Sequence, residues 1–361
     1  MSNQDMSRRR FLRNLGIAGG GALALPILNA CGDSDDSGSS SASDTAPETT
    51  AAASTDTTAA AAAGAGGLIG LTLNGLNDYT RGVATGAYAA LEGTDFELQV
   101  VQGNYDPGEE LANIENFLAQ GAVGIVIQPN TAESAGAGAQ AAQEAGVPVG
   151  NCIWPGPSDA DEFFTSVAQL DSVEGGRLIG NYLLEQGPGS GKVVVVQGVV
   201  GQGFSERIDE GLDEVLGGSD YEIVVREQGF FDRAAAVDVV QNALQAHPDT
   251  AVIVDYAAAM SNGICQYLET EGIENILHVT SDADEEMVSW FGTPYLAATR
   301  YYSSAQTGLI ATQGVVAALT GGEPVFGTPI DQLIVTADNV ESVVEENPYM
   351  FFDYKDLVQD I

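Results

Sequence analysis

The stretch "GEELANIENFLAQGAVGIVIQP", residues 108–129, joins two kinds of apolar pattern. Residues 108–120 carry apolar side chains at helical spacing, and residues 123–128 form a short, continuously apolar run. The first pattern predicts a helix, and the second predicts a strand that is covered on both faces. This helix–strand unit therefore predicts a parallel sheet with helices packed on it.

The same alternation runs through the body of the chain from Leu68 onward. Alternating strands and helices build parallel sheets with helices on both faces, and about 290 residues suffice for two domains. We therefore predict an α/β fold of two doubly wound parallel-sheet lobes. The further strands are expected at 68–73, 96–102, 147–152, 192–198, 221–228, 250–256 and 276–282, and the further helices at 132–146, 204–216, 234–247 and 259–272.

The N-terminal stretch "SRRRFLRNLGIAGGGALALPILNAC", residues 7–31, predicts export. Paired arginines before a short apolar run resemble a twin-arginine signal, and "LNAC" resembles a lipobox with Cys31 as the lipidated residue. A buried N-terminal helix with an incidental cysteine is the alternative. We predict a signal peptide over residues 1–30. Residues 31–67 lack bulky apolar side chains and are expected to form a disordered tether.

The composition is strongly acidic, with 12 basic and 51 acidic residues and a net charge of −39. Such a chain repels nucleic acid and anionic lipid, so neither is an expected partner. The acidic residues are spread along the chain, which fits adaptation to salty surroundings better than a cationic partner. Cys152 and Cys265 are expected to be buried free thiols.

Catalytic chemistry has little support in the sequence. His247 and His278 have no Cys or acidic neighbours at metal-ligand spacing. "GPGSGKV" (187–193) and "GVVGQGFSE" (198–206) both lack parts of a nucleotide-binding motif. We therefore expect no catalytic residue, no metal and no cofactor, and a dinucleotide-dependent enzyme stays the weaker alternative.

Three segments carry a family resemblance: "ELANIENFLAQGAVGIVIQP" (110–129), "FFDRAAAVDVVQNALQAHPD" (230–249) and "LAATRYYSSAQTGLIATQGVVAALTGGEPV" (296–325). From about Leu68 to about Val335 the chain resembles a periplasmic sugar-binding protein of the ribose-binding type, which delivers ligand to an ABC transporter.

The resemblance implies the type I periplasmic binding protein fold, in which two lobes close about a three-segment hinge. The hinge is expected near Leu170–Asp171, Tyr302–Ser303 and Ile330–Asp331. Lobe 1 would comprise residues 68–169 and 303–330, and lobe 2 residues 170–302 and 331–361.

The resemblance also implies a ligand site at the carboxyl ends of the strands. Arg207 nearly matches a family arginine, one place out of register. The other positions carried over are Asn77, Asp78, Tyr79, Thr80, Gln128, Phe231 and Asp282.

Several positions depart from the family. The family's Asp–Arg clamp on sugar hydroxyls falls on Ile153 and Trp154, its Asn–Asp pair falls on 257–258, and a glutamine is replaced by Tyr302. An unpaired buried hydroxyl costs about 1–3 kcal/mol, so ribose is not the expected ligand. A larger or less hydroxylated carbohydrate, a polyol or another small polar metabolite fits better.

Aromatic and charged residues at strand ends complete the expected site. Trp154 and Tyr256 would add aromatic area, although an aromatic at a strand end can also be core. Arg300 and Tyr302 share one side of their strand by the two-residue alternation, so Arg300 could reach the cleft. For Asp255 and Arg300 the residues leave a ligand role and a structural role equally open.

The expected function is therefore an exported, monomeric lipoprotein that captures a sugar or polyol and delivers it to an ABC transporter permease. It would be anchored through Cys31, on the outer side of the cytoplasmic membrane or in the periplasm. A ligand sensor that reports to a membrane receptor is the alternative. A LacI-like regulator would need a DNA-binding head where this chain has a signal and a tether.

Overall fold

The computed structural model describes residues 66–153, 158–324 and 326–346. The expected signal peptide, nearly all of the expected tether, Cys31 and Trp154 lie outside these residues. Within the described ranges, no helix combines the length and the apolar character that crossing a membrane requires.

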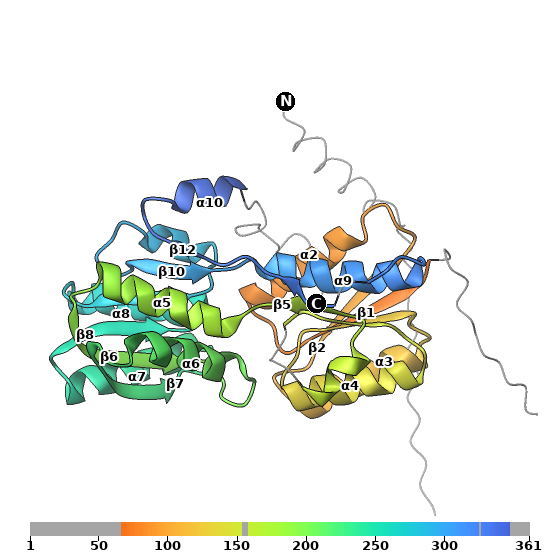
Figure 1. Ribbon diagram of the computed structural model, residues 1–361, viewed down its shortest axis with the longest axis horizontal. Coiled ribbons are helices and arrows are strands. Elements are labelled where there is room, and N and C mark those ends of the chain that lie inside the picture. Colours follow the sequence, from red (N-terminus) through yellow and green to blue (C-terminus); the bar gives the residue numbers. More distant parts are fainter. Residues whose placement is uncertain (1–65, 154–157, 325, 347–361) are drawn as a thin grey trace, which may run out of the picture. The chain divides into compact units, whose positions relative to one another are not determined.

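The first sheet has the strand order β11-β5-β4-β3-β1-β2, and every paired strand in it is parallel. Two separate apolar cores flank this sheet, one formed with α2 (Asp78–Ala90) and α9 (Ser304–Leu319) and the other with α3 (Pro107–Ala119) and α4 (Ala132–Glu144) (Figure 1). The strands are β1 (Leu68–Leu73), β2 (Glu97–Gln102), β3 (Gly124–Ile127), β4 (Val149–Asn151), β5 (Ser166–Gln169) and β11 (Thr328–Pro329).

The second sheet has the order β12-β10-β9-β8-β6-β7. Its helices are α5 (Ser172–Gln186), α6 (Phe204–Leu216), α7 (Arg233–Ala246), α8 (Ala258–Glu271) and α10 (Val340–Glu346). Its strands are β6 (Ser190–Gln197), β7 (Asp220–Gln228), β8 (Thr250–Asp255), β9 (Leu277–Ser281), β10 (Ala298–Tyr301) and β12 (Leu333–Val335). Short 3-10 turns, η1 (Asp159–Phe163) and η2 (Glu286–Trp290), complete the described elements.

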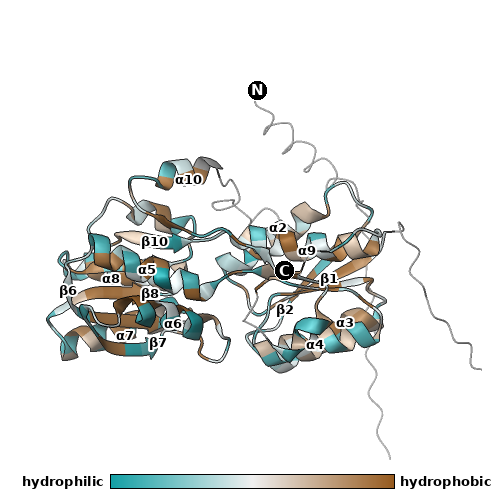
Figure 2. Cartoon of the chain, in the orientation of Figure 1, coloured by the Kyte–Doolittle hydropathy of each residue, from teal (hydrophilic) through white to brown (hydrophobic). Residues whose placement is uncertain are grey.

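The central strands are apolar because helices cover both of their faces. In β3 and in residues 193–196 of β6 every side chain is buried, and Figure 2 shows apolar residues concentrated along the strands. The predicted strands and helices agree with the observed ones to within about two residues. The predicted α/β class with two doubly wound sheets is confirmed, with one exception to its parallel character.

The exception is β12, which pairs antiparallel with β10 at the edge of the second sheet. Residues 330–332 alone separate it from β11 of the first sheet. The chain therefore returns to the second sheet at the end where β10 left it, and β12 has to run in the opposite direction.

The chain passes between the two sheets three times, after β5, after β10 and after β11. Asp171 caps α5 by accepting from the backbone N–H groups of Val173 and Glu174. The Gln332 side chain donates to the Asp171 carbonyl oxygen at 2.9 Å, so the first and third of these crossings are joined directly.

Glycines let helices pack with backbones in contact on each sheet. A Cβ at Gly86 of α2 would lie 1.7 Å from the Ala305 carbonyl oxygen of α9. In the second sheet, a Cβ at Gly211 of α6 would lie 1.9 Å from the Val173 carbonyl oxygen of α5. Backbone cannot move aside as a flexible side chain can, so both positions require glycine.

We expect Gly86→Ala to lower the free energy of unfolding by about 1–3 kcal/mol, because overpacking against backbone outweighs the better helix propensity of alanine. Urea denaturation followed by circular dichroism measures this change. Gly108→Ala is the matched control, since its Cβ would meet only an Asp106 carboxylate oxygen, at 3.1 Å. Equal stability of the two variants would contradict the packing argument.

Candidate functional site

A cavity of about 240 Å³ lies where the strands of both sheets end. In parallel α/β sheets the loops that follow the carboxyl ends of strands form the ligand sites, because the helix that covers the sheet starts there. The cavity is lined by Asn74, Asn77, Asp78, Tyr79, Tyr105, Gln128, Pro129, Ile153, Gln202, Phe204, Phe231, Tyr256, Ala257, Ala258, Ala259, Asp284 and Tyr302.

The first sheet contributes the residues that follow β1, β2, β3 and β4. Asn77 caps α2 by accepting from the Thr80 backbone N–H, and the Thr80 hydroxyl in turn accepts from the Asn77 backbone N–H. This capping box fixes the start of α2, from which Asp78 and Tyr79 line the cavity. Thr80 itself does not line the cavity; its contribution is to hold the loop.

Two turns of the same shape each place an aromatic ring in the cavity. The sequences Gly-Asn-Tyr-Asp (103–106) and Gly-Phe-Phe-Asp (229–232) follow β2 and β7. In both turns the glycine N–H bonds the end of the neighbouring strand at 2.8 Å, and both middle residues are left-handed, with φ of 48° and 60° in the first turn and 57° and 56° in the second.

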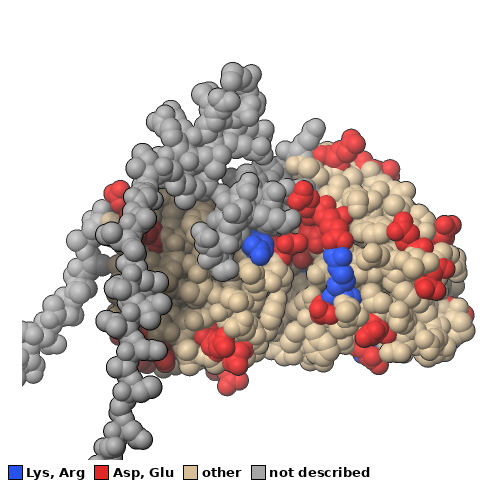
Figure 3. All heavy atoms as spheres, turned by 180° about the vertical axis from the view of Figure 1, so that it is seen from behind, with Lys and Arg blue, Asp and Glu red and all other residues tan. Residues whose placement is uncertain are grey.

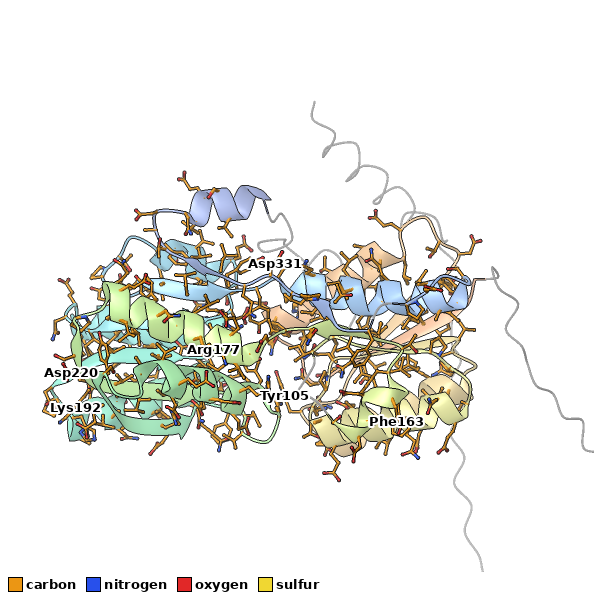
Figure 4. All side chains as sticks on the ribbon, viewed as in Figure 1. Tyr105, Phe163, Arg177, Lys192, Asp220 and Asp331 are labelled. Atoms are coloured by element: carbon orange, nitrogen blue, oxygen red, sulfur yellow. The ribbon has the colours of Figure 1, made fainter. Side chains whose placement is uncertain are left out.

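A left-handed backbone conformation at an aromatic residue costs of order 1–3 kcal/mol of conformational strain, and such strain is typical of functional sites. The rings of Tyr105 and Phe231 occupy the space that a Cβ at Gly75 and at Gly198 would need. Figure 4 labels Tyr105. The sequence prediction chose Phe231 and missed Tyr105, although the repeated Gly-x-aromatic-Asp pattern could have identified it.

A continuous wall of rings crosses the cavity. Ring centroids are 6.0 Å apart for Tyr79 and Tyr302, 6.4 Å for Tyr302 and Phe204, and 6.3 Å for Phe204 and Phe231. The wall starts in α2 of the first sheet and ends in the loop after β7 of the second. Such tilted rings offer an apolar face to a flat or ring-shaped ligand. We refer to these four residues as the aromatic wall.

Two side-chain amides that line the cavity have unused hydrogen-bonding capacity. Gln128 is 3% exposed, and its Oε1 has no hydrogen-bond partner among the described residues. Asn74 donates to the Pro129 carbonyl oxygen at 3.3 Å, while its Oδ1 is also without a partner in the described parts of the chain. Buried polar atoms are normally paired, so these oxygens indicate where a ligand would donate hydrogen bonds.

Arg300 is fully buried beneath the aromatic wall. Its guanidinium carbon lies 4.7 Å from the Tyr302 ring centroid and 5.7 Å from the Phe204 centroid. A Cβ at Gly175 would contact the guanidinium, which shows how tightly α5 packs on it. Arg300 and Tyr302 do lie on one side of the chain, as expected, but Arg300 does not line the cavity. Its cation–π contacts support the rings from below.

Asp282 also lies beside the cavity without lining it. It is 8% exposed, has a left-handed backbone with φ of 73°, and its Oδ1 accepts from the Ala283 N–H. Burial raises the pKa of Asp282 to about 8. The charge of Asp282 in turn adds to the effect of burial in raising the pKa of Tyr79 and of Tyr302.

Asp255 does not line the cavity, and its side chain is fully buried at the end of β8. Its carboxylate accepts from the Thr280 hydroxyl and the Ala257 N–H and lies 2.7 Å from His278 Nε2. Arg207 lies within 3.8 Å of Asp171 and does not line the cavity. The remaining predicted residues do line it, apart from Trp154, which lies outside the described residues: Asn77, Asp78, Tyr79, Gln128, Phe231, Tyr256 and Tyr302.

A row of three side chains resembles a catalytic triad with a cysteine nucleophile: Cys265, His278 and Asp255. All three side chains are buried, and the Cys265 sulfur lies 3.5 Å from His278 Nδ1. However, Nδ1 also lies 2.9 Å from the Tyr295 carbonyl oxygen, which accepts but cannot donate. Nδ1 therefore carries a hydrogen and cannot take the thiol proton, so the group packs the core.

No group of three or more His, Cys, Asp or Glu side chains suited to a metal ion occurs among the described residues. A second groove, of about 790 Å³, runs along α5 and β12 and lies entirely on the second sheet. It has neither the ring wall nor the buried amides of the cavity. The cavity is therefore the better candidate for a small-molecule site.

Comparison with known proteins agrees with this geometry. The model of the periplasmic binding protein domain matches residues 69–323. This chain belongs to the periplasmic binding protein family. Among curated relatives of this binding protein, the ribose import binding protein of Escherichia coli is 25% identical over 268 residues, which cover 74% of this chain and 89% of the relative. The xylitol-binding protein of Mycolicibacterium smegmatis is 25% identical, with 77% and 79% covered.

Solved structures show the same fold. A carbohydrate transporter solute-binding protein from Agrobacterium radiobacter, in complex with D-arabinose, matches with a TM-score of 0.69 at 18% identity, covering 78% of this binding protein and 98% of that chain. An ABC transporter solute-binding protein from Bacillus halodurans with bound myo-inositol matches with a TM-score of 0.69 at 20% identity, covering 78% and 99%. The resemblance to the ribose-binding type, expected from the sequence, is confirmed.

The raised pKa of Asp282 predicts that the effect of replacing this residue on the free energy of unfolding depends on pH. The unfolded carboxyl has a pKa of about 3.9, so the folded chain holds this proton more tightly and loses stability as the pH rises from about 4 to about 8. In Asp282→Asn, the asparagine tolerates the left-handed backbone and keeps an oxygen that can accept from the Ala283 N–H, but it has no carboxyl group to ionise. We expect the stability advantage of this variant over the wild type to grow by about 1–3 kcal/mol between pH 5 and pH 8.

Chemical denaturation at the two pH values measures this difference. Asp220→Asn is the matched control, because it removes a carboxylate that is exposed at the start of β7. An advantage of Asp282→Asn that is the same at both pH values would show that Asp282 is ionised in the folded chain at pH 5.

Proposed function

We propose that this chain is an exported, lipid-anchored solute-binding protein that captures a sugar or polyol between its two lobes and delivers it to an ABC transporter permease. One observation carries the proposal: the loops of both sheets form a single cavity that combines an aromatic wall with buried, unpaired amide oxygens. Ring faces suit the C–H face of a sugar or cyclitol, and the amides suit its hydroxyls.

The ligands named for the relatives support this class. Ribose, xylitol, D-arabinose and myo-inositol, named for those proteins, are all small polyhydroxylated molecules. In this chain Ile153, Ala257 and Ala258 line the cavity, and each falls where the family resemblance places a polar or charged residue. We therefore propose a ligand with fewer buried hydroxyls than ribose has, bound more by ring contact than by a charged clamp.

We further propose that the three crossings between the sheets act as the hinge, with lobe 1 formed by residues 68–169 and 303–330 and lobe 2 by 170–302 and 331–361. The capping of α5 by Asp171 and the bond from Gln332 to the Asp171 carbonyl support a hinge that bends at a few positions. Ligand would bind both lobes and so stabilise the closed form.

Binding is tested by thermal-shift screening of a panel of sugars and polyols, followed by calorimetric titration of each compound that stabilises the protein. We expect Gln128→Ala to weaken binding of such a compound by about tenfold or more, because a ligand hydroxyl loses its buried partner. Gln99→Ala, on the exposed face of β2, is the matched control and keeps the affinity. Turnover of the compound, or no stabilisation by any panel member, would contradict the proposal.

The anchor is tested separately. We expect Cys31→Ala to move the protein from the membrane fraction to the soluble fraction, because a lipidated cysteine is the attachment that the "LNAC" stretch predicts. Fractionation followed by immunoblotting measures this shift, and mass spectrometry of the mature N-terminus shows whether Cys31 carries a lipid. Membrane association that survives the substitution would contradict the anchor.

A further inference from the structure

The charged side chains that line the cavity are both acidic. Asp78 and Asp284 line it, from α2 of the first sheet and from the loop after β9 of the second. No Lys, Arg or His is among the described residues that line it. The nearby Arg233 lies 2.5 Å from Glu286 in an ion pair, and Arg300 lies beneath the rings of Tyr302 and Phe204.

Asp284 differs from the many acidic residues on the surface, which Figure 3 shows scattered over one face of the molecule. It is only 6% exposed, so adaptation of the surface to salt does not account for it. Its carboxylate accepts from the Asn262 side chain at 2.8 and 3.0 Å and from the Met287 N–H at 2.8 Å. All these donors are neutral, and Asp284 forms no ion pair within the described ranges.

Asp284 is buried outside any ion pair of the described residues. Arg233, whose pKa is raised first by its bond to Glu286 and then by the charges of Asp284 and Asp78, is itself paired with Glu286, so it offsets the desolvation of the Asp284 carboxylate only in part. Burial raises the pKa of Asp284, and the charge of Asp78 raises it further. A positive group in the cavity would remove both penalties, because it would lie between two carboxylates and replace the lost solvation.

The aromatic wall adds a second, independent attraction for a cation. The faces of aromatic rings are electron-rich, and several rings around one space recognise ammonium groups. Tyr105 and Tyr256 also line the cavity, so rings meet it from both sheets. The unpaired Gln128 Oε1 and Asn74 Oδ1 are acceptors that can receive N–H donors as well as hydroxyls.

We propose that the ligand of this cavity is a sugar or cyclitol that carries a protonated amine, held between Asp78 and Asp284 against the aromatic wall. This inference rests on the proposed function and narrows its ligand class. The ring of the ligand would lie on the wall, its ammonium would pair with the carboxylates, and its hydroxyls would bond to the amides.

Calorimetric titration of the mature protein with matched pairs tests the charge directly. The pairs are D-glucosamine with D-glucose, D-galactosamine with D-galactose, and an amino-substituted inositol with the parent inositol. In at least one pair we expect the amine member to bind about tenfold or more tighter than the neutral member, as hydrogen bonds to charged groups are the stronger ones. The N-acetyl derivative of that amine, which keeps the nitrogen without the charge, should lose this preference.

Two variants locate the effect. Asp284→Asn removes the buried negative charge and keeps part of the hydrogen bonding to Asn262. Asp78→Asn removes the exposed negative charge and leaves the second sheet unchanged. Each should reduce the preference for the amine by about tenfold while changing the affinity for the neutral member less. Asp220→Asn, labelled at its exposed site in Figure 4, makes the same change in net charge and should leave the preference intact.

The outcomes separate the two proposals. If only neutral members bind, or if both members of every pair bind equally, the charge inference is overturned and the sugar- or polyol-binding function stands. If no member of any pair binds to correctly folded protein, the proposed function fails with it. If Asp220→Asn abolishes the preference for the amine as fully as Asp284→Asn does, the preference comes from the net charge of the protein. That result would overturn the proposed ammonium site.

Discussion

Burial of the central strands on both faces is the constraint on which the rest of the structure depends. The valines of β6 and the residues of β3 have no exposed side, so each sheet needs helices on both faces. Strand–helix alternation with such strands gives parallel pairing, and parallel pairing brings the carboxyl ends of the strands to one edge. Loops at that edge are free of the packing that fixes the core. The cavity can therefore carry strained turns and unpaired amides that a core would not tolerate.

The chemistry of the cavity follows from what those loops hold. Two equivalent turns present Tyr105 and Phe231, and glycines at positions 75 and 198 leave the space for the two rings. Arg300 is fully buried beneath the wall and contacts the Phe204 and Tyr302 rings. The family's polar clamp positions carry apolar residues here, while acids and rings remain. The cavity therefore combines ring contact and negative charge within a fold that can carry many different sites.

Much of the fold could be predicted from the sequence, because apolar runs report burial and burial is what builds the sheets. The antiparallel β12 could not, since its direction depends on where the chain re-enters the second sheet, which no local pattern reports. In the site, positions at strand ends such as Gln128 and Phe231 were predictable from strand order and family resemblance. Asp284 and Phe204 were missed because they lie away from the strand ends that pattern reasoning selects: Asp284 is three residues beyond the end of β9, and Phe204 is the first residue of α6, seven residues beyond the end of β6.

Other residues show why strand-end position alone is not enough. Asp255 ends β8, yet His278 and Thr280 on the neighbouring strand turn its carboxylate into the core. Arg300 lies on the same side of the chain as Tyr302, yet the Tyr302 ring covers its guanidinium group. Which of two adjacent side chains reaches a cavity depends on contacts between strands, and these contacts are visible only in three dimensions.

A crystal structure of the mature body with the tightest-binding compound of a sugar and polyol panel tests the central claim most directly. We expect electron density for the ligand ring against Phe231 and Tyr302, with a polar ligand atom at hydrogen-bond distance from Gln128. Density for the compound in the groove along α5 and β12, or a cavity that stays empty while the compound binds elsewhere, would contradict the account.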